Sequence, residues 1–189
     1  YRNLSERKQR YPLFIHKKGF RIALLNYTYG TNGIKVSPPN IVNYIDKEII
    51  LQDIRSAQAR RPDAIIACMH WGNEYQSLPN REQRELADWL LQQGVTHIIG
   101  SHPHVIQPME LRTDGTRQHV VVYSLGNFIS NMHDENTDGG LIFTLQLEKS
   151  PLPQPVRPFY SGQSRSPALE SASFPFPYCR VSHCGYDLV

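Results

Sequence analysis

Short apolar segments alternate with amphipathic ones through the middle of this chain. The segments Phe20 to Tyr29, Asp63 to Met69 and Val95 to Ile99 are rich in β-branched and other apolar residues, which is typical of buried strands. Between them lie two stretches with apolar residues at helical spacing, and each starts at a helix-capping residue, Asp46 or Asn80. The pattern predicts strand, helix, strand, helix, strand, and therefore a mostly parallel sheet with right-handed crossovers.

The ends of both predicted helices are also marked in the sequence. Pro62 follows the first helix and ends it, because proline cannot continue a helical hydrogen-bond pattern. Asn80 and Gln83 have the spacing of a capping box at the start of the second helix, which continues to Gly94. The next strand follows at once, as expected for a compact crossover.

After residue 104 the pattern becomes that of antiparallel strands. The segments Val105 to Arg112 and Arg117 to Tyr123 flank Thr113-Asp114-Gly115-Thr116, where Asp-Gly favours a tight hairpin turn. Leu141 to Leu147 alternates apolar and polar residues and predicts one more strand. We therefore expect an α/β fold of the α+β sandwich type, with strand-helix-strand units followed by antiparallel strands.

The two ends of the chain lack such a pattern. Tyr1 to Lys18 is charged and is expected to be a lead-in whose beginning lies upstream. From Ser150 onward lysine is absent and seven of the fourteen prolines occur. We therefore expect one domain over residues 1–149 and a Pro-rich, disordered tail over residues 150–189. The alternative for the tail is that its aromatic-proline pieces dock on a partner.

Composition narrows the function classes. The 189 residues, 40% of them hydrophobic, suffice for one substantial core. A net charge of +3 without a dominant basic run does not indicate nucleic-acid binding. No apolar segment approaches the ~18 residues that a membrane span needs, and no secretion signal opens the chain.

Three histidines follow the carboxyl ends of two predicted strands. His70 closes one strand, and His102 and His104 come just after the next. Ligands of open α/β sheets bind at this edge, and three converging histidines are the number expected of a metal centre. Taken alone, a His-x-His pair also occurs without any metal. His97 lies inside a strand and is expected to be a core or interface histidine.

Other polar residues are expected at the same edge. Glu74 is a candidate general base, a partner that orients a histidine, or a group that binds a substrate amine, and the alternative is a solvated carboxylate. With it, His70 and His104 are the candidate catalytic residues. For Trp71, packing is the favoured interpretation because an indole buries a large area. The candidate substrate-binding residues at this edge are Trp71, Gly72, Ser124 and Asn127.

Four spaced motifs carry a resemblance to a known family. They are NYTYGTNG (Asn26 to Gly33), HWGNEY (His70 to Tyr75), GSHPHVIQP (Gly100 to Pro108) and YSLGNF (Tyr123 to Phe128). Read together, they resemble the capsule-synthesis CapA/PgsA family, which is associated with poly-γ-glutamate capsule production and is related to calcineurin-like metallophosphoesterases. The similarity extends from about Pro12 to Glu148.

The resemblance implies a partial metallophosphoesterase-like fold and a divalent metal site. His70, His102 and His104 correspond to ligands of a two-metal site in such folds. The remaining ligands come from earlier Asp, Gly-Asp and Gly-Asn-His motifs, which are not found in this sequence. The chain therefore resembles the carboxyl half of a family member, and a dinuclear site is expected only together with the amino-terminal half.

Three functional hypotheses follow. The first is a capsule-biosynthesis protein that acts as a metal-dependent, phosphoesterase-like hydrolase. The second is a non-catalytic component of a capsule synthesis or export complex that binds an acidic polymer with the help of Arg81, Arg84, Arg112 and Arg117. The third is an incomplete fragment without activity.

The resemblance also implies partners and a location. The expected partners are poly-γ-glutamate or a phosphoester substrate and other subunits of a capsule synthesis complex, with no nucleic acid. Family members are typically attached to the cell envelope, so a membrane-associated location is implied, although this chain carries no signal or anchor of its own.

Overall fold

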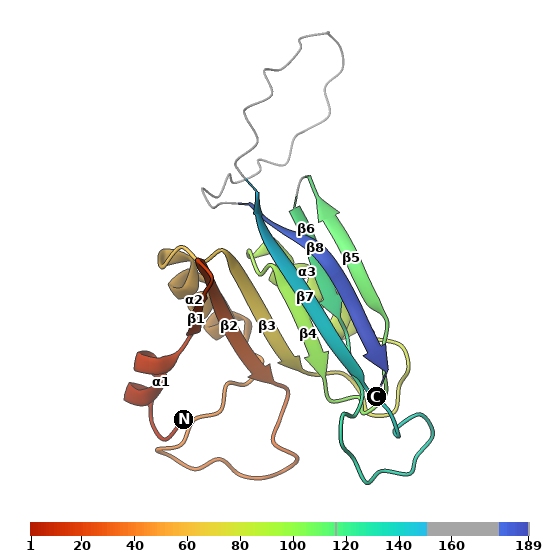
Figure 1. Ribbon diagram of the computed structural model, residues 1–189. Helices are drawn as coiled ribbons and strands as arrows, with labels where there is room; N and C mark the ends of the chain where they lie inside the picture. The colour runs from red at the N-terminus through yellow and green to blue at the C-terminus, as the bar shows by residue number, and fades with distance from the viewer. Residues whose placement is uncertain (116, 151–177, 189) are drawn as a thin grey trace, which may run out of the picture.

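A computed structural model describes residues 1–115, 117–150 and 178–188 of the chain (Figure 1). The elements in chain order are α1 (Leu4–Arg10), β1 (Leu13–Lys17), β2 (Phe20–Thr28), α2 (Lys47–Ala59), β3 (Ala64–His70), α3 (Arg81–Gln92), β4 (His97–Ser101), β5 (Met109–Asp114), β6 (Arg117–Val122), β7 (Leu141–Ser150) and β8 (Tyr178–Leu188).

The main sheet has six strands in the order β1-β2-β3-β4-β6-β5. Strands β2, β3, β4 and β6 run parallel to one another, whereas the edge strands β1 and β5 pair antiparallel with β2 and β6. Strands β7 and β8 form a separate antiparallel pair. The predicted mixed α/β fold is thus confirmed, together with the antiparallel hairpin β5–β6 at the predicted Asp-Gly turn.

Both predicted helix starts are confirmed. The Asp46 side chain accepts hydrogen bonds from the backbone of Glu48 and Ile49 at the start of α2. Asn80 and Gln83 form the reciprocal capping box at the start of α3. These caps fix where each crossover helix begins, and so they anchor the loops that follow β2 and β3.

The ends of the chain differ from the expected lead-in and tail. The segment 1–18, expected to be a lead-in, forms α1 and β1. Helix α1 has no apolar stripe, but Arg7 binds Asp53 of α2 in a bidentate pair with N–O distances of 2.6 and 3.2 Å. Of the expected tail, residues 178–188 form β8, and residues 151–177 and 189 lie outside the described residues. The division of the chain at residue 149 stays a prediction.

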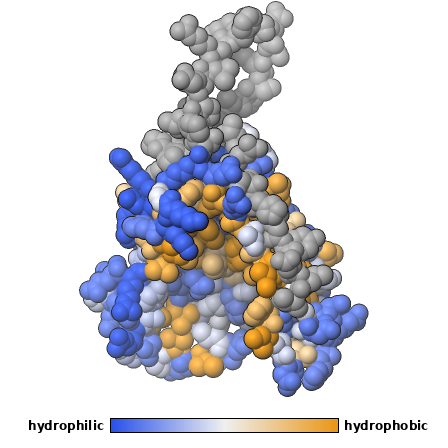
Figure 2. Space-filling model, viewed as in Figure 1, coloured by the Kyte–Doolittle hydropathy of each residue, from blue (hydrophilic) through white to orange (hydrophobic). Residues whose placement is uncertain are grey.

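The two faces of the main sheet are covered differently. Helices α2 and α3 pack on one face, where they bury the main apolar core with β2, β3 and β4 (Figure 1). On the opposite face β7 packs over β4 and β6 through Phe143 and Leu145. At the edge of the sheet, strand β1 leaves Leu13 54% and Ile15 41% exposed, and Figure 2 shows apolar surface gathered on the face that β7 partly covers. The carboxyl edge of the parallel strands lies between these two layers.

Candidate metal site at the carboxyl edge of the sheet

The three predicted histidines do meet at one edge of the sheet. His70 is the last residue of β3 and pairs in register with Ser101, the last residue of β4. His102 and His104 follow Ser101 directly. The His70 and His102 ring centroids are 4.6 Å apart, and those of His102 and His104 are 6.0 Å apart. Parallel pairing therefore places the three rings in one cluster, as the strand pattern predicted.

Backbone hydrogen bonds join the two loops that carry these residues. The Trp71 N–H donates to the Ser101 carbonyl at 3.1 Å, and the Tyr75 N–H donates to the Pro103 carbonyl at 2.8 Å. Because these bonds hold the loop after β3 against the loop after β4, Glu74 lies beside the histidines. Its Oε1 is 3.8 Å from His104 Nε2.

Three side chains at this edge can hold a metal ion. Ligand atoms of Glu74, His102 and His104 all lie within 4.8 Å of one another. Carboxylate oxygen and imidazole nitrogen are suitable donors for divalent first-row metals. The set differs from the expected His70, His102 and His104, because Glu74 takes the third place and His70 lies alongside, next to His102.

The backbone of the histidine loop is held in an unfavourable conformation. His102 has φ +104° and His104 has φ +62°, and Tyr75 on the facing loop has φ +62°. L-amino acids with side chains rarely adopt positive φ, and such strain gathers at functional sites. The loops are therefore shaped to present these side chains toward one another.

Burial keeps two of the histidines neutral over more of the pH range. The pKa of His70 is lowered by burial first and then by the nearby charge of His104. The pKa of His102 is lowered by burial first and by His70 next, while Glu74 opposes this shift. Since only the neutral imidazole can coordinate a metal, these shifts favour the ligating form.

Two tyrosines flank the histidines on their open side. The Tyr29 ring lies 4.3 Å from the His102 ring and 5.6 Å from the His70 ring, measured between centroids. The Tyr75 ring stacks on His104 at 6.2 Å. Both tyrosines are nearly half exposed. The sequence pattern did not single them out, although both fall inside the motifs that carry the family resemblance.

The expected substrate-binding residues lie at different depths. Trp71 is 2% exposed, and its indole N–H donates to the Tyr123 carbonyl at 2.9 Å, which fits the packing interpretation. Ser124 is fully buried and its Oγ accepts a hydrogen bond from the Gly126 N–H. Asn127 reaches the site itself, where its Oδ1 is 2.9 Å from His104 Nδ1.

A buried amide network supports the loops from below. Gln83 of α3 donates through Nε2 to Gln107 Oε1 at 2.9 Å, and Gln107 in turn donates to the Gln76 carbonyl at 2.8 Å. Gln83 also fills the space beside Gly72, where a Cβ would lie 2.6 Å from the Gln83 carboxamide. Gly72 also has φ +85°, a backbone conformation that favours glycine. Sequence reasoning identified Gln83 only as a capping residue and missed Gln107.

Two of the four arginines proposed to assist polymer binding, Arg81 and Arg112, form ion pairs within the chain. Arg81 pairs with Glu85 within α3. Arg112 contacts Asp88 and Glu110 at 2.6 Å each. Ion pairs with neighbouring carboxylates leave these guanidinium groups less able to attract an acidic polymer.

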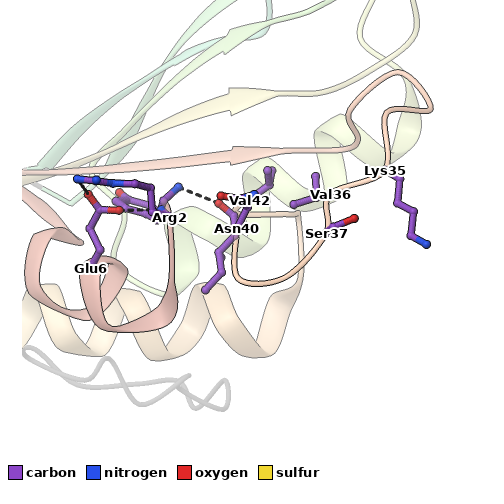
Figure 3. A pocket seen from close by; sticks show the side chains of 9 residues that line it. Arg2, Glu6, Lys35, Val36, Ser37, Asn40 and Val42 are labelled. Atoms are coloured by element: carbon purple, nitrogen blue, oxygen red, sulfur yellow. Dashed lines mark hydrogen bonds and ion pairs between the residues drawn. The ribbon is translucent and has the colours of Figure 1, made fainter.

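A separate groove of about 570 Å³ lies near the start of α1 (Figure 3). It is lined by Tyr1, Arg2, Glu6, Lys35, Val36, Ser37, Asn40, Ile41 and Val42. None of the candidate site residues is among them.

Within the described part of the chain, no helix is long and apolar enough to cross a lipid bilayer.

Comparisons of the sequence with known proteins identify relatives of this chain. The sequence profile of the bacterial capsule synthesis protein PGA_cap matches residues 1–132. The "PGA biosynthesis protein CapA" of Bacillus subtilis (strain 168) is 33% identical over 135 residues, which cover 70% of this chain and 34% of that protein. The "Capsule biosynthesis protein CapA" of Bacillus anthracis is 30% identical over 118 residues, 59% of this chain and 27% of that protein. The match thus spans about a third or less of each relative's length.

Proposed function

Because this chain belongs to the bacterial capsule synthesis protein PGA_cap family, we propose that it takes part in poly-γ-glutamate capsule production and binds a divalent metal ion that serves hydrolysis. The observation that carries this proposal is the group formed by Glu74, His102 and His104, whose ligand atoms lie within 4.8 Å of one another. His70 adds a third imidazole next to His102.

The donor set fits a catalytic metal. Imidazole and carboxylate ligands at an exposed loop leave room for a substrate, whereas structural metal sites are closed by protein ligands. Glu74 is exposed, and the His104 side chain is 33% exposed, so a substrate can approach from solvent. A divalent cation held there supplies a Lewis acid that polarises a phosphoryl or acyl oxygen.

The side chains around that position supply the rest of the chemistry. Glu74 lies next to His104, and its second carboxylate oxygen can accept or return a proton as the bond to the leaving group breaks. Tyr29 and Tyr75 shield the histidines on their open side and offer aromatic surface to a substrate. The substrate that we propose is a phosphoester or the amide of the acidic polymer.

The wider context is proposed from the family alone. We place the whole protein at the cell envelope, in contact with other subunits of a poly-γ-glutamate synthesis complex. We also propose that the sheet is part of a metallophosphoesterase-like fold, in which further ligands complete a two-metal site. Strands β2, β3 and β4 with their crossover helices support this proposal.

The test combines metal binding with turnover. We expect the purified chain to bind Mn²⁺ or Zn²⁺ in calorimetric titrations and to hydrolyse bis(p-nitrophenyl) phosphate or poly-γ-glutamate only when metal is present. His104→Ala should abolish both, whereas His16→Ala, an exposed histidine on β1, should change neither. Metal-independent hydrolysis that persists in His104→Ala would overturn the proposal.

A further inference from the structure

Two histidines of this site hydrogen-bond through Nδ1 to side chains whose donor or acceptor role is already fixed by other hydrogen bonds. His70 Nδ1 lies 2.9 Å from Thr28 Oγ1, and His104 Nδ1 lies 2.9 Å from Asn127 Oδ1. A neutral imidazole carries hydrogen on one nitrogen only. The direction of these two bonds therefore decides which nitrogen keeps a lone pair for a metal.

The Thr28 hydroxyl can only accept from His70. Its single hydrogen is donated to the Gly30 carbonyl at 2.7 Å. The Gly30 N–H returns a longer hydrogen bond of 3.3 Å to the same oxygen. Because no second hydroxyl hydrogen exists, the bond to the ring requires the hydrogen on His70 Nδ1.

The orientation of the Asn127 carboxamide is also fixed by a second hydrogen bond. Its Nδ2 donates to the carbonyl of Thr137 at 2.9 Å, so the amide nitrogen points away from the ring. Thr137 is fully buried, which holds this contact in place. The oxygen Oδ1 therefore faces His104, and an amide oxygen can only accept. His104 Nδ1 must then carry the hydrogen as well.

Both rings consequently keep a lone pair on Nε2. For His104 this nitrogen faces Glu74 Oε1 at 3.8 Å. A lone pair that faces a carboxylate oxygen is unfavourable unless a proton or a cation lies near both atoms. The arrangement is complementary to a positive charge at this position.

We infer that Thr28 and Asn127 are positioning residues, which set the tautomers of His70 and His104 so that each ring keeps its lone pair on Nε2, and that His104 presents this lone pair to a divalent cation. Neither side chain is itself a ligand. Oriented hydrogen bonds of this kind raise the basicity of a ligating imidazole and fix its plane. The consequence for metal binding rests on the proposed function, whereas the tautomers themselves can be observed without any metal.

The first experiment measures the tautomers in the metal-free full chain. With ¹⁵N-labelled histidine, long-range ¹H–¹⁵N correlation spectra identify the nitrogen that carries hydrogen in each ring. We expect Nδ1–H for both His70 and His104 in the wild type. Thr28→Val keeps the shape of the side chain but removes the acceptor, so His70 should shift toward Nε2–H while His104 stays unchanged. Asn127→Ala should do the reverse.

Conservative variants test whether the hydrogen-bond acceptor is what matters. Thr28→Ser keeps the hydroxyl and Asn127→Asp keeps an oxygen facing the ring, so both should retain Nδ1–H. In titrations with Mn²⁺, Asn127→Ala should bind about 10- to 100-fold more weakly than the wild type, as found for lost partners of ligating histidines. Asn127→Asp should keep most of the affinity.

The outcomes separate this inference from the proposed function. Wild-type Nε2–H on either ring, or an unchanged His70 tautomer in Thr28→Val, would overturn the inference even if metal binds. Wild-type Nδ1–H on both rings without any Mn²⁺ affinity would uphold the tautomers and overturn the metal function. If Thr28→Val does not fold, the tautomers observed in the wild type and in Thr28→Ser still test the inference.

Discussion

Strand β4 carries a histidine at its first residue and two more just beyond its last, and the two ends hold imidazole in opposite ways. His97 is fully buried, its Nδ1 accepts a hydrogen bond from the Val120 N–H at 3.2 Å, and its Nε2 has no partner. His102 and His104 lie in a strained loop that is open to solvent on one side. The difference shows that chemistry here depends on the end of the strand, since the same residue type inside the sheet serves packing.

The causes of the pKa shifts also differ between the two ends of β4. Burial, with a smaller contribution from His119, lowers the pKa of His97 to about 3. At the other end the pKa of His102 is also lowered, but Glu74 opposes the shift. A carboxylate next to an imidazole creates a place for a cation, whereas His97 is fully buried and the charge that shifts its pKa is that of a second imidazole, His119.

The largest effect is expected from Gly100→Ala, which should displace β4 and so disturb the surroundings of the histidines at both of its ends. A Cβ at Gly100 would overlap the Tyr123 carbonyl oxygen and lie 2.6 Å from the Trp71 indole nitrogen. The backbone of Tyr123, just after β6, and a buried ring cannot both move aside, so the free energy of unfolding should fall by about 3 kcal/mol or more. Urea denaturation measures this loss. Gly30→Ala is the control, because nothing lies within 4 Å of its added Cβ.

His104→Ala should affect the carboxyl end of β4 alone. Loss of a ligand should weaken Mn²⁺ binding by more than about 100-fold, beyond what the loss of an orienting partner costs. The His104 side chain is 33% exposed, so the free energy of unfolding should change by less than about 1 kcal/mol. Calorimetric titration and urea denaturation test the two statements, and wild-type affinity in this variant would contradict the assignment of the site.

His97→Leu should give the opposite result. It removes the acceptor for the Val120 N–H, and an unsatisfied buried donor costs about 1–3 kcal/mol of stability. Metal affinity should stay within about twofold of the wild type, a change worth about 0.4 kcal/mol. His97→Asn, which offers an oxygen near the position of Nδ1, should recover part of the stability. A large loss of Mn²⁺ affinity in His97→Leu would show that the two ends are coupled.

The stability of the folded chain should also depend on pH. The unfolded chain binds a proton at His97 near the ordinary pKa of 6.5, but the folded chain does so only near pH 3. Below pH 6.5 the unfolded state therefore binds more protons, and stability falls by up to about 1.4 kcal/mol per pH unit from this group. The pKa of His119 is lowered by burial too and acts in the same direction. Urea midpoints between pH 7 and 4 should show a shallower slope in His97→Leu.

Local signals in the sequence predicted the central part of the fold. Strands β2, β3 and β4 and the caps at Asp46 and Asn80 depend on apolar runs and nearby residues, which a sequence displays directly. Helix α1 was missed because its residues show no buried stripe. It is held by the Arg7–Asp53 pair, a contact between residues 46 positions apart that no local pattern records.

The candidate site was predicted in part for a similar reason. His70, His102 and His104 follow strand ends, so their convergence can be predicted from a parallel sheet. Thr28 was missed because its importance arises only from the register that pairs it with His70. The role of Glu74 among the possible ligands depends on the hydrogen bond that joins the loop at Tyr75 to Pro103. Sequence order alone does not determine such a contact.

The hydrogen bonds that orient the two imidazoles also have a consequence for the order of folding. Thr28 and His70 are 42 residues apart, and His104 and Asn127 are 23 apart. Contacts between distant residues close long loops and form slowly, whereas α2 and α3 can form from local interactions. We therefore expect helical circular dichroism to recover early during refolding and Mn²⁺ affinity to appear in the final kinetic phase, as a late marker that the parallel strands have paired.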